Sequence, residues 1–179
     1  RDGDLLFDVG GLSKGDISVF AIGTPGSEVL ELGLGRFEEL CADPSFQTRA
    51  EGAIAGWVSG LSLGIRKEMP PKETVQLVAG REISVAGCKE ARPGSGVVWV
   101  SHLDGASYFL GRNNLPQIDP GSDVIPISDL AWLQSIDNAK YRVLDTTSCL
   151  REGSLWSGLE RFHALVLDCL EQNWLDQEE

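Results

Sequence analysis

Apolar residues recur with two different periods along this chain, and the change of period divides it into segments. Between residues 45 and 69, and again between residues 154 and 176, they return at helical spacing. Between residues 74 and 150 they mostly alternate with polar residues in short runs that end at turn-forming residues, which is typical of β-strands. The pattern predicts an α+β chain with a strand-rich middle between helices.

The helix predicted over residues 45–69 carries a stripe of glycines. They recur at every fourth position, as Gly52, Gly56, Gly60 and Gly64. A glycine there either lets a second backbone pack closely or weakens the helix by up to ~1 kcal/mol relative to alanine. We expect close packing, and we expect Pro70 and Pro71 to end the helix, because proline disfavours helical geometry in the residue before it.

The helix predicted over residues 154–176 is amphipathic. Ser154 can cap its first amides, and Glu160 and Asp168 lie opposite an apolar stripe. The helix must therefore pack on the strand-rich region or on a neighbouring domain. The candidate docking surface consists of Leu155, Trp156, Leu159, Phe162, Val166 and Trp174.

The strand-rich middle contains one strong hairpin signal. Residues 97–103 and 106–110 are β-prone runs that flank Asp104 and Gly105, a dipeptide suited to the positive φ angles of a type I′ turn. Further strands are predicted over residues 74–78, 82–85 and 141–146.

Turn residues define three other segments. Residues 17–22 and 28–32 flank a Gly-Thr-Pro-Gly turn, which predicts a β-hairpin within an N-terminal segment, residues 1–44. Residues 111–126 hold three prolines and predict a surface loop, and residues 127–133 predict a short helix capped by Ser128. We interpret residues 74–150 as a β-roll and the whole of residues 1–179 as one domain.

The formal charge of −12 is unevenly spread: −6 over residues 1–60, +2 over residues 61–116 and −8 over residues 117–179. An excess of carboxylates repels nucleic-acid phosphates, so we expect no nucleic-acid partner. Basic side chains concentrate only in the middle third. They form either a candidate site for an acidic peptide or an ordinary solvated surface, with Arg66, Lys67, Arg81 and Arg112 as the candidate residues.

Residue types that hold metals or carry catalysis are sparse. The thiols and imidazoles are Cys41, Cys88, Cys149, Cys169, His102 and His163, and none stands in a metal-ligand spacing. We expect reduced thiols, although spacing alone leaves disulfides open. Asp119, Asp123 and Asp129 lack the calcium-loop pattern, and residues 10–15 lack phosphate-loop spacing. The sequence therefore predicts no catalytic residue, metal or cofactor in this domain.

No stretch approaches the ~20 apolar residues that a membrane span needs, so we expect no direct membrane insertion by this segment. The chain begins at Arg1, without an initiator methionine or a signal peptide. We therefore expect it to be a piece of a longer protein.

From Val97 onward the sequence resembles a known family. The residues that carry the resemblance, in matching order and spacing, are Trp99-Val100, Tyr108 to Gly111, Pro126 to Ser128, Trp132-Leu133, Asp145-Thr146, Leu155 to Leu159 and Phe162 to Leu167. Residues 15–21 match more loosely. The family comprises the permease and ATP-binding subunits of bacteriocin exporters that handle leader peptides of the nitrile-hydratase-like type.

The resemblance implies a cytosolic N-terminal domain of a bacterial inner- or plasma-membrane protein, with a β-roll of the cyclic-nucleotide-binding-like or cupin-like kind. ATP and Mg, membrane helices and ATP hydrolysis would belong to the remainder of such a transporter, because this sequence has no Walker A loop. A cyclic-nucleotide site needs an arginine for the phosphate and a carboxylate for the ribose. Where that site would fall, the sequence offers a proline loop with only Arg112 and Asp129, so we expect a roll that is degenerate for nucleotide binding.

Two functions of different classes follow. The leading hypothesis is a non-catalytic regulatory or substrate-recognition domain of the exporter, which engages the leader peptide or the transporter core. In that setting a homodimer could form through the full-length transporter. The alternative is a regulatory domain that senses a small molecule inside the β-roll. A third hypothesis, a cupin-like enzyme, requires a bound metal.

Overall fold

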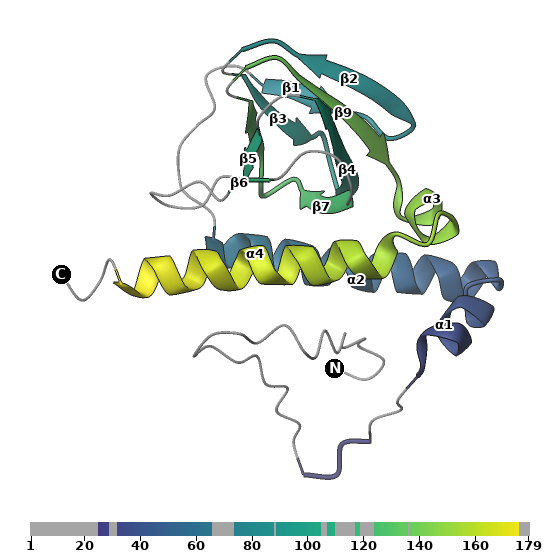
Figure 1. Ribbon diagram of the computed structural model, residues 1–179. Coiled ribbons are helices and arrows are strands. Elements are labelled where there is room, and N and C mark those ends of the chain that lie inside the picture. Colours follow the sequence, from purple (N-terminus) through teal and green to yellow (C-terminus); the bar gives the residue numbers. More distant parts are fainter. Residues whose placement is uncertain are drawn as a thin grey trace.

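Helices lie at both ends of the described chain and the strands lie between them (Figure 1). The structure, a computed structural model, describes residues 25–28, 32–65, 74–87, 89–104, 107–109, 117–118, 124–135 and 137–175. The helices are α1 (Leu34–Leu40), α2 (Pro44–Ile65), α3 (Thr146–Arg151) and α4 (Leu155–Leu175). The strands are β1 (Thr74–Leu77), β2 (Arg81–Val85), β3 (Glu90–Pro93), β4 (Val97–Asp104), β5 (Ser107–Phe109), β6 (Gln117–Ile118), β7 (Val124–Ser128), β8 (Leu133–Ser135) and β9 (Ala139–Leu144).

The strands form two sheets that together make a β-roll. A four-stranded sheet has the order β2-β9-β4-β7, and a five-stranded sheet has the order β1-β3-β8-β5-β6. Among the described strands only β1 and β3 pair in parallel. The predicted fold class is confirmed at the level of its architecture: α+β, with a β-roll, flanking helices and a C-terminal amphipathic helix.

Alternating burial separates an inner from an outer face of the sheets. In β9, Ala139, Tyr141 and Val143 are buried, whereas Lys140 and Arg142 are exposed. Residues from both sheets meet in one hydrophobic core, which includes Val98, Val100, Ile125, Ile127 and Leu133. The roll is therefore filled by apolar side chains, and the charged residues of β9 lie outside it.

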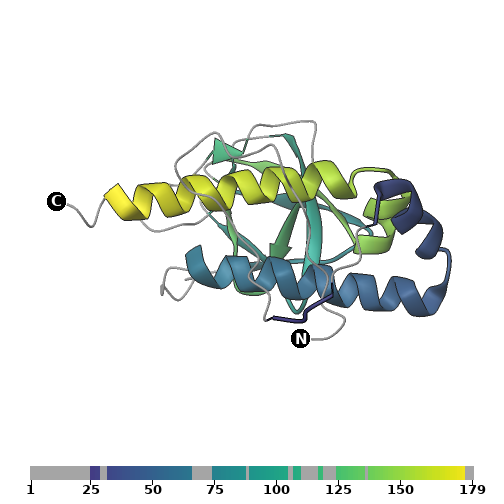
Figure 2. The same ribbon diagram turned by 90° about the horizontal axis from the view of Figure 1, so that it is seen from below.

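The two long helices lie side by side beneath the roll (Figures 1 and 2). Both run from the end of the molecule that carries α1 and α3 towards the opposite end. Helix α4 packs on β7 through its apolar stripe, and α2 packs on β7 and on α4. The helix layer thus covers one edge of the four-stranded sheet.

Close approach of α4 to the roll depends on one glycine. A Cβ atom at Gly158 would lie 2.6 Å from the carbonyl oxygen of Val124 and 2.8 Å from Cζ3 of Trp99. Both distances are shorter than van der Waals contact, so a larger residue at this position must displace the helix or the strands. The glycine within the Leu-Trp-Ser-Gly-Leu segment therefore has a packing role.

Helix α2 begins at a capping signal that the sequence contains. Oδ1 of Asp43 accepts a 2.8 Å hydrogen bond from the amide of Ser45, and the Asp43 carbonyl accepts a 2.9 Å hydrogen bond from the amide of Gln47. Pro44 occupies the first helical position, where the missing N–H has no intrahelical partner to lose. The hydrogen bonds from Ser45 hold the pKa of Asp43 below its usual value.

The glycine stripe of α2 is exposed rather than packed. The helix predicted over residues 45–69 is confirmed as α2, but a Cβ atom at Gly52, Gly56 or Gly60 would meet nothing within 4 Å. The close packing expected at these three positions is therefore not found in the described structure. The surroundings of Gly64, and residues 66–73 with their two prolines, lie outside the described residues.

The hairpin predicted around Asp104 is wrong in its pairing. Strands form at both predicted runs, but β4 pairs with β9 and β7, while β5 pairs with β8 and β6 in the other sheet. Strands that are distant in the sequence occupy both edges of β4, because their apolar residues complete the core. That burial overrides the local turn preference. Gly105 lies outside the described residues.

The segment predicted as a proline loop contributes two strands, β6 and the start of β7. All five residues of β7 are buried, including Pro126. Proline is accommodated because β7 is an edge strand, where one side of the backbone has no strand to bond. The loop predicted over residues 111–126 is therefore wrong at residues 117–118 and 124–126, where a Pro in an apolar run was interpreted as a break. Residues 111–116 and 119–123 lie outside the described residues.

The short helix predicted over residues 127–133 does not form. Ile127 and Ser128 complete β7, a turn follows, and β8 begins at Leu133. The hydroxyl of Ser128 does accept a hydrogen bond from a backbone amide, that of Leu130 at 3.2 Å. Serine makes the same bond in turns as at helix starts, so the residue alone could not distinguish the two.

The remaining boundaries are partly confirmed. Strands predicted over residues 74–78, 82–85 and 141–146 correspond to β1, β2 and β9, although α3 begins at Thr146. The N-terminal segment, residues 1–44, contains the unpredicted helix α1, and most of its predicted hairpin lies outside the described residues. Strand β3 was not predicted, because the apolar residues that alternate in its sequence Glu-Ala-Arg-Pro are alanine and proline, which are depleted in strands.

Candidate functional site

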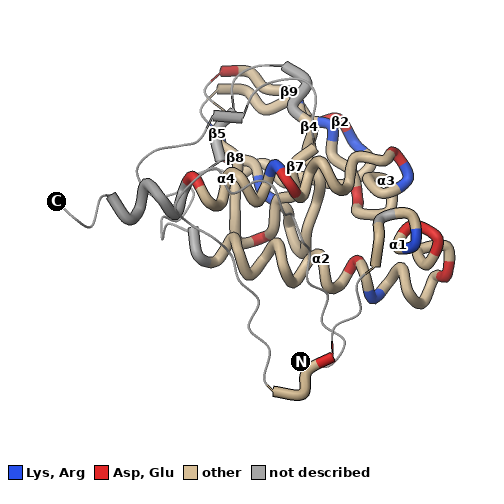
Figure 3. The backbone as a smooth tube through the Cα atoms, turned by 60° about the horizontal axis from the view of Figure 1, so that its bottom comes forward, with Lys and Arg blue, Asp and Glu red and all other residues tan. Residues whose placement is uncertain are grey.

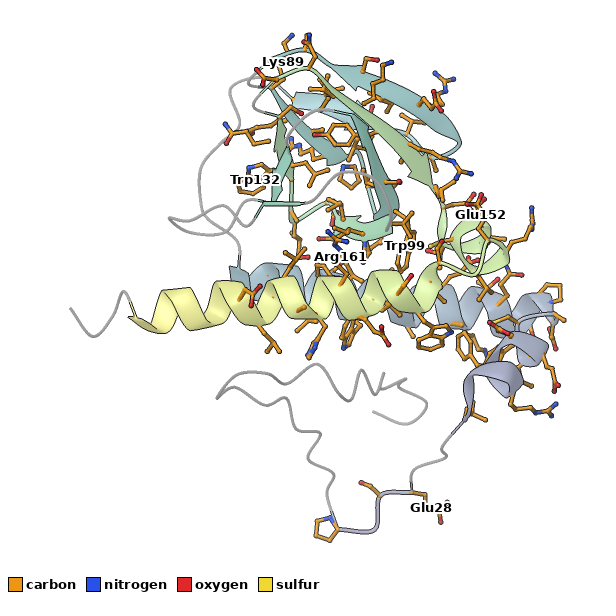
Figure 4. The ribbon with its side chains drawn as sticks, in the orientation of Figure 1. Glu28, Lys89, Trp99, Trp132, Glu152 and Arg161 are labelled. Carbon is orange, nitrogen blue, oxygen red and sulfur yellow. The ribbon has the colours of Figure 1, made fainter. Side chains whose placement is uncertain are left out.

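A short helix, α3, connects the roll to the helix pair. Nε1 of Trp99 on β4 donates a 3.0 Å hydrogen bond to Oγ1 of Thr146. The hydroxyl of Thr147 donates to Oε1 of Glu51 on α2. Consecutive threonines of α3 therefore bond to different layers, and Figure 4 shows Trp99 between the roll and α4. We call Trp99, Thr146, Thr147, Glu51 and Gln47 the α3 joint.

Gln47 completes the α3 joint from the first turns of α2. Its Nε2 lies 2.9 Å from Oε1 of Glu51 and 2.8 Å from Oγ1 of Thr147. The three side chains form a closed, partly buried set of hydrogen bonds. Hydrogen bonds to a charged acceptor are stronger than those between neutral groups, so Glu51 fixes the spacing between α2 and α3.

Caps on both sides of α3 hold it in place. Oδ1 of Asp145 accepts a 2.6 Å hydrogen bond from the amide of Ser148, and this bond lowers the pKa of the Asp145 carboxyl. At the other end, Arg142 of β9 donates from Nη1 and Nη2 of its guanidinium group to the carboxylate of Glu152, at 3.0 and 2.5 Å. Figure 4 shows Glu152 at the end of the roll beside α3. The connection between β9 and α4 is therefore restrained at each step.

Helix α3 carries a buried thiol. Sγ of Cys149 is 3.3 Å from Oγ of Ser154, and burial raises the pKa of the Cys149 thiol to about 11. The Ser154 hydroxyl, predicted to cap α4, also donates to the Cys149 carbonyl at 3.3 Å. It therefore bonds backwards to α3 instead of forwards to the first amides of α4.

Aromatic rings join the helix pair. Trp57 of α2 lies edge-on to Phe162 of α4, with centroids 6.0 Å apart, and stacks on His163 at 6.2 Å. His163 is buried, and its Nδ1 has no hydrogen-bond partner among the described residues. Burial lowers the pKa of this imidazole, because the charged form loses its hydration. His163 therefore has a packing position, as expected, whereas the side chain of His102 lies outside the described residues.

The roll interior contains one polar pair. The hydroxyls of Ser135 on β8 and Tyr141 on β9 are 2.6 Å apart, and both residues are fully buried. The bond links the two sheets, and the apolar core surrounds it. On β3, burial raises the pKa of Glu90, which Arg92 partly offsets.

The basic residues predicted to bind an acidic peptide are only partly described. Arg81 is exposed at the start of β2, and Arg66, Lys67 and Arg112 lie outside the described residues. Lys140, a residue not singled out from the sequence, lies on β9 directly opposite Ser84 of β2. Figure 3 shows Lys and Arg positions on this part of the roll. The structure therefore adds a cation next to β2, on the face opposite to that of Arg81.

The predicted docking surface is largely internal. Leu155, Leu159, Phe162 and Val166 are buried in the core of this chain. They pack against its own roll and helix α2, so they cannot form an exposed surface as well. Trp156 is half-buried, with its ring 5.4 Å from that of Phe37. The side chain of Trp174 lies outside the described residues.

Three other findings concern metals, thiols and membrane spans. Within the described part of the chain, no group of three or more His, Cys, Asp and Glu side chains is arranged to hold a metal ion. Cys41 and Cys149 are buried free thiols, and burial also raises the pKa of Cys41. None of the described helices combines the length and apolar character needed to cross a membrane.

Sequence reasoning missed the α3 joint, although one signal for it was present. Asp145 followed three residues later by Ser148 is a capping pattern, and it marks the start of α3. The bonds of Thr147 to Glu51 and Gln47 join positions about a hundred residues apart. No local pattern predicts such a contact.

Comparisons with known proteins give structural matches only. No protein-family model matches the chain, and no curated protein sequence matches it. The heme domain of CooA from Rhodospirillum rubrum aligns with a TM-score of 0.43 and 11% identity, over 84% of this chain and 98% of that one. The heme domain of CooA from Carboxydothermus hydrogenoformans aligns with a TM-score of 0.41 and 10% identity, over 55% of this chain and 84% of that one. At these scores and identities the likeness carries no inference about ligand or partner.

Proposed function

We propose that this chain is a non-catalytic regulatory domain in which the β-roll receives a binding signal and the α3 joint passes it to the helix pair. The observation that carries the proposal is the pair of bonds from adjacent threonines, Thr146 to the roll and Thr147 to α2. A shift of β4 relative to α3 must move or break one of these bonds. The helix pair therefore responds to events in the roll through defined contacts.

More specifically, we propose that the chain is a domain of a peptide exporter. It is supported by the resemblance from Val97 onward and by the exposed cations beside β2. In that setting the domain recognises the leader peptide or the transporter core. ATP and Mg would act elsewhere in the full-length transporter, whose two copies would also supply any dimer contact.

Titration of a labelled leader peptide of the nitrile-hydratase-like type tests recognition, with hydrogen exchange as the second readout. We expect binding to slow amide exchange in the roll and to change it in α2. In Thr147→Val, binding should persist while the response of α2 is lost. Thr48→Val is the matched control, because the Thr48 hydroxyl bonds only within α2, to the Pro44 carbonyl at 2.9 Å.

The outcomes separate the two parts of the proposal. If neither the leader peptide nor the transporter core binds, the exporter assignment fails. If binding changes exchange in the roll while α2 responds equally in wild type and Thr147→Val, transmission through the α3 joint fails.

A second candidate is a domain that senses a small molecule inside the roll, and the Ser135–Tyr141 pair favours it. These hydroxyls are the polar groups inside an apolar interior, which is the composition of small-molecule sites. A thermal-shift series with cyclic nucleotides tests it, because a ligand at a hundredfold excess over its Kd stabilises by about 2.7 kcal/mol. An unchanged Tm across the series contradicts this candidate.

A further inference from the structure

Strand β2 is an open edge of the four-stranded sheet. Among the described strands it pairs only with β9, and Arg81, Glu82 and Ser84 are exposed. The opposite edge, β7, is buried under the helix pair. Figure 1 shows β2 on the rim of the roll, far from α2 and α4. Along β2, every second residue therefore directs its backbone N–H and C=O away from the sheet.

We propose that the β2 edge binds an extended acidic peptide segment as an added strand. The inference rests on the proposed function and names the partner of this recognition domain. Main-chain hydrogen bonds would supply most of the affinity, and side chains at alternate positions would supply the specificity. The five residues of β2 are sufficient to pair with one short strand.

Two cations set the charge of the partner. Lys140 of β9 lies directly opposite Ser84 of β2. The side chain of Ser84 is short enough for the lysine stem to extend across β2. An added strand lies ~5 Å beyond β2, or ~10 Å from β9, which a lysine and a glutamate side chain span together. Arg81 is exposed at the start of β2, and it lies on the face opposite to that of Ser84. A carboxylate beside either residue gains an ion pair.

The remaining positions restrict the pattern. Glu82 lies on the same face as Ser84, and its partner Arg142 is already bonded to Glu152. A peptide carboxylate beside Glu82 would therefore be repelled. Ile83 is half-buried and Val85 is buried, so the other face accepts an apolar side chain. The preferred segment carries a single carboxylate level with Ser84 and apolar residues on the opposite face.

A fluorescein-labelled peptide of valine and threonine with one central glutamate is the probe. We expect saturable binding by anisotropy and slower exchange of β2 amides. Lys140→Glu should weaken binding about fivefold, which is the scale of one exposed ion pair. Arg49→Glu is the control, because it makes the same charge change on an exposed residue of α2 and should leave binding unchanged. A peptide with a central lysine should bind Lys140→Glu better than wild type.

Backbone recognition is tested by N-methylation of alternate peptide residues, which removes the hydrogen-bond donors of one edge. We expect one of the two methylated registers to lose binding. Equal binding of the unmethylated peptide and both methylated registers overturns the proposal, as does unchanged affinity in Lys140→Glu. Self-pairing of the chain through β2 in sedimentation, without competition by the peptide, also overturns it.

The result is separable from the proposed function. A leader peptide that binds equally well to wild type and Lys140→Glu would overturn the β2 site and leave the regulatory domain intact. Absence of any leader-peptide binding would instead contradict the exporter assignment.

Discussion

At the scale of single residues, burial favours the neutral form of the one histidine in the described part of the helix layer, His163. His163 stacks on Trp57, and burial holds its pKa below the ordinary value of 6.5. The cause of that shift is the loss of hydration on burial, and the acidic residues Glu160 and Asp168 of the same helix are exposed. Packing of the helix pair therefore depends on an uncharged imidazole.

Stability should decrease on mild acidification because of His163. The unfolded chain takes up a proton near pH 6.5, and the folded chain does so only at a lower pH. The contribution of His163 to the free energy of unfolding is therefore complete above pH 6.5. It is lost as the pH falls through the pKa of His163 in the unfolded chain and then through its pKa in the folded chain. Between about pH 7 and about pH 5, the free energy of unfolding measured with urea should decrease more steeply in wild type than in His163→Phe. Parallel slopes would contradict the prediction.

Cys149 should be inert in the folded protein. With a pKa of about 11, almost none of its thiol is ionised at neutral pH, and the thiolate is the reactive form. Labelling with iodoacetamide followed by peptide mapping should modify Cys149 only at the rate of unfolding, and denaturant should remove the protection. Labelling as rapid as in the denatured chain would show that the site opens without unfolding.

At the scale of elements, two helices contain glycines with opposite roles. Gly56 of α2 faces open space, whereas Gly158 of α4 lies against Val124 and Trp99. The same residue type therefore weakens one helix and permits the packing of another.

Alanine substitutions should reveal this contrast. Gly56→Ala should stabilise by up to ~1 kcal/mol through helix propensity alone. Gly158→Ala should destabilise by about 1–3 kcal/mol, because overpacking outweighs the same gain in propensity. Chemical denaturation of both variants measures the difference, and equal effects would mean that α4 does not approach the roll as closely as described.

The sequence predicted the helices and strands better than it predicted which strands pair with each other. The periodicity of α2 and α4 and the β-prone run of β4 identified these elements correctly. The turn signal at Asp104 did not select the partner of β4, because two strands distant in the sequence bury more apolar surface there. The buried apolar run of β7 was obscured by Pro126, which an edge strand tolerates. At the candidate site, Arg81 was found by its charge, whereas Thr147 has no local signal.

At the scale of the whole molecule, the α3 joint determines whether the roll and the helix pair behave as one unit. Trp99 bonds to Thr146 of α3, and Glu51 bonds to the adjacent residue, Thr147. Trp99 and Glu51 share no hydrogen bond in the described part of the chain. If the α3 joint couples Trp99 and Glu51 energetically, that coupling therefore passes through α3.

A double-mutant cycle tests this coupling. We expect the effects of Trp99→Phe and Glu51→Ala on the free energy of unfolding to be non-additive by at least ~0.5 kcal/mol. The same cycle with Trp99→Phe and Glu39→Ala is the control, since the Glu39 carboxylate bonds to Arg36 on the exposed side of α1. Additivity in both cycles would show that the layers are energetically independent.

The unequal edges of the four-stranded sheet also limit how this protein can assemble. One edge, β7, is covered by helices, and the other, β2, has no further strand beside it among the described residues. Two copies joined through β2 would leave a continuous sheet that ends in β7 on both sides, so growth through this sheet stops at a pair. A fibre needs two adhesive edges on each subunit, and burial of β7 removes one of them from this sheet.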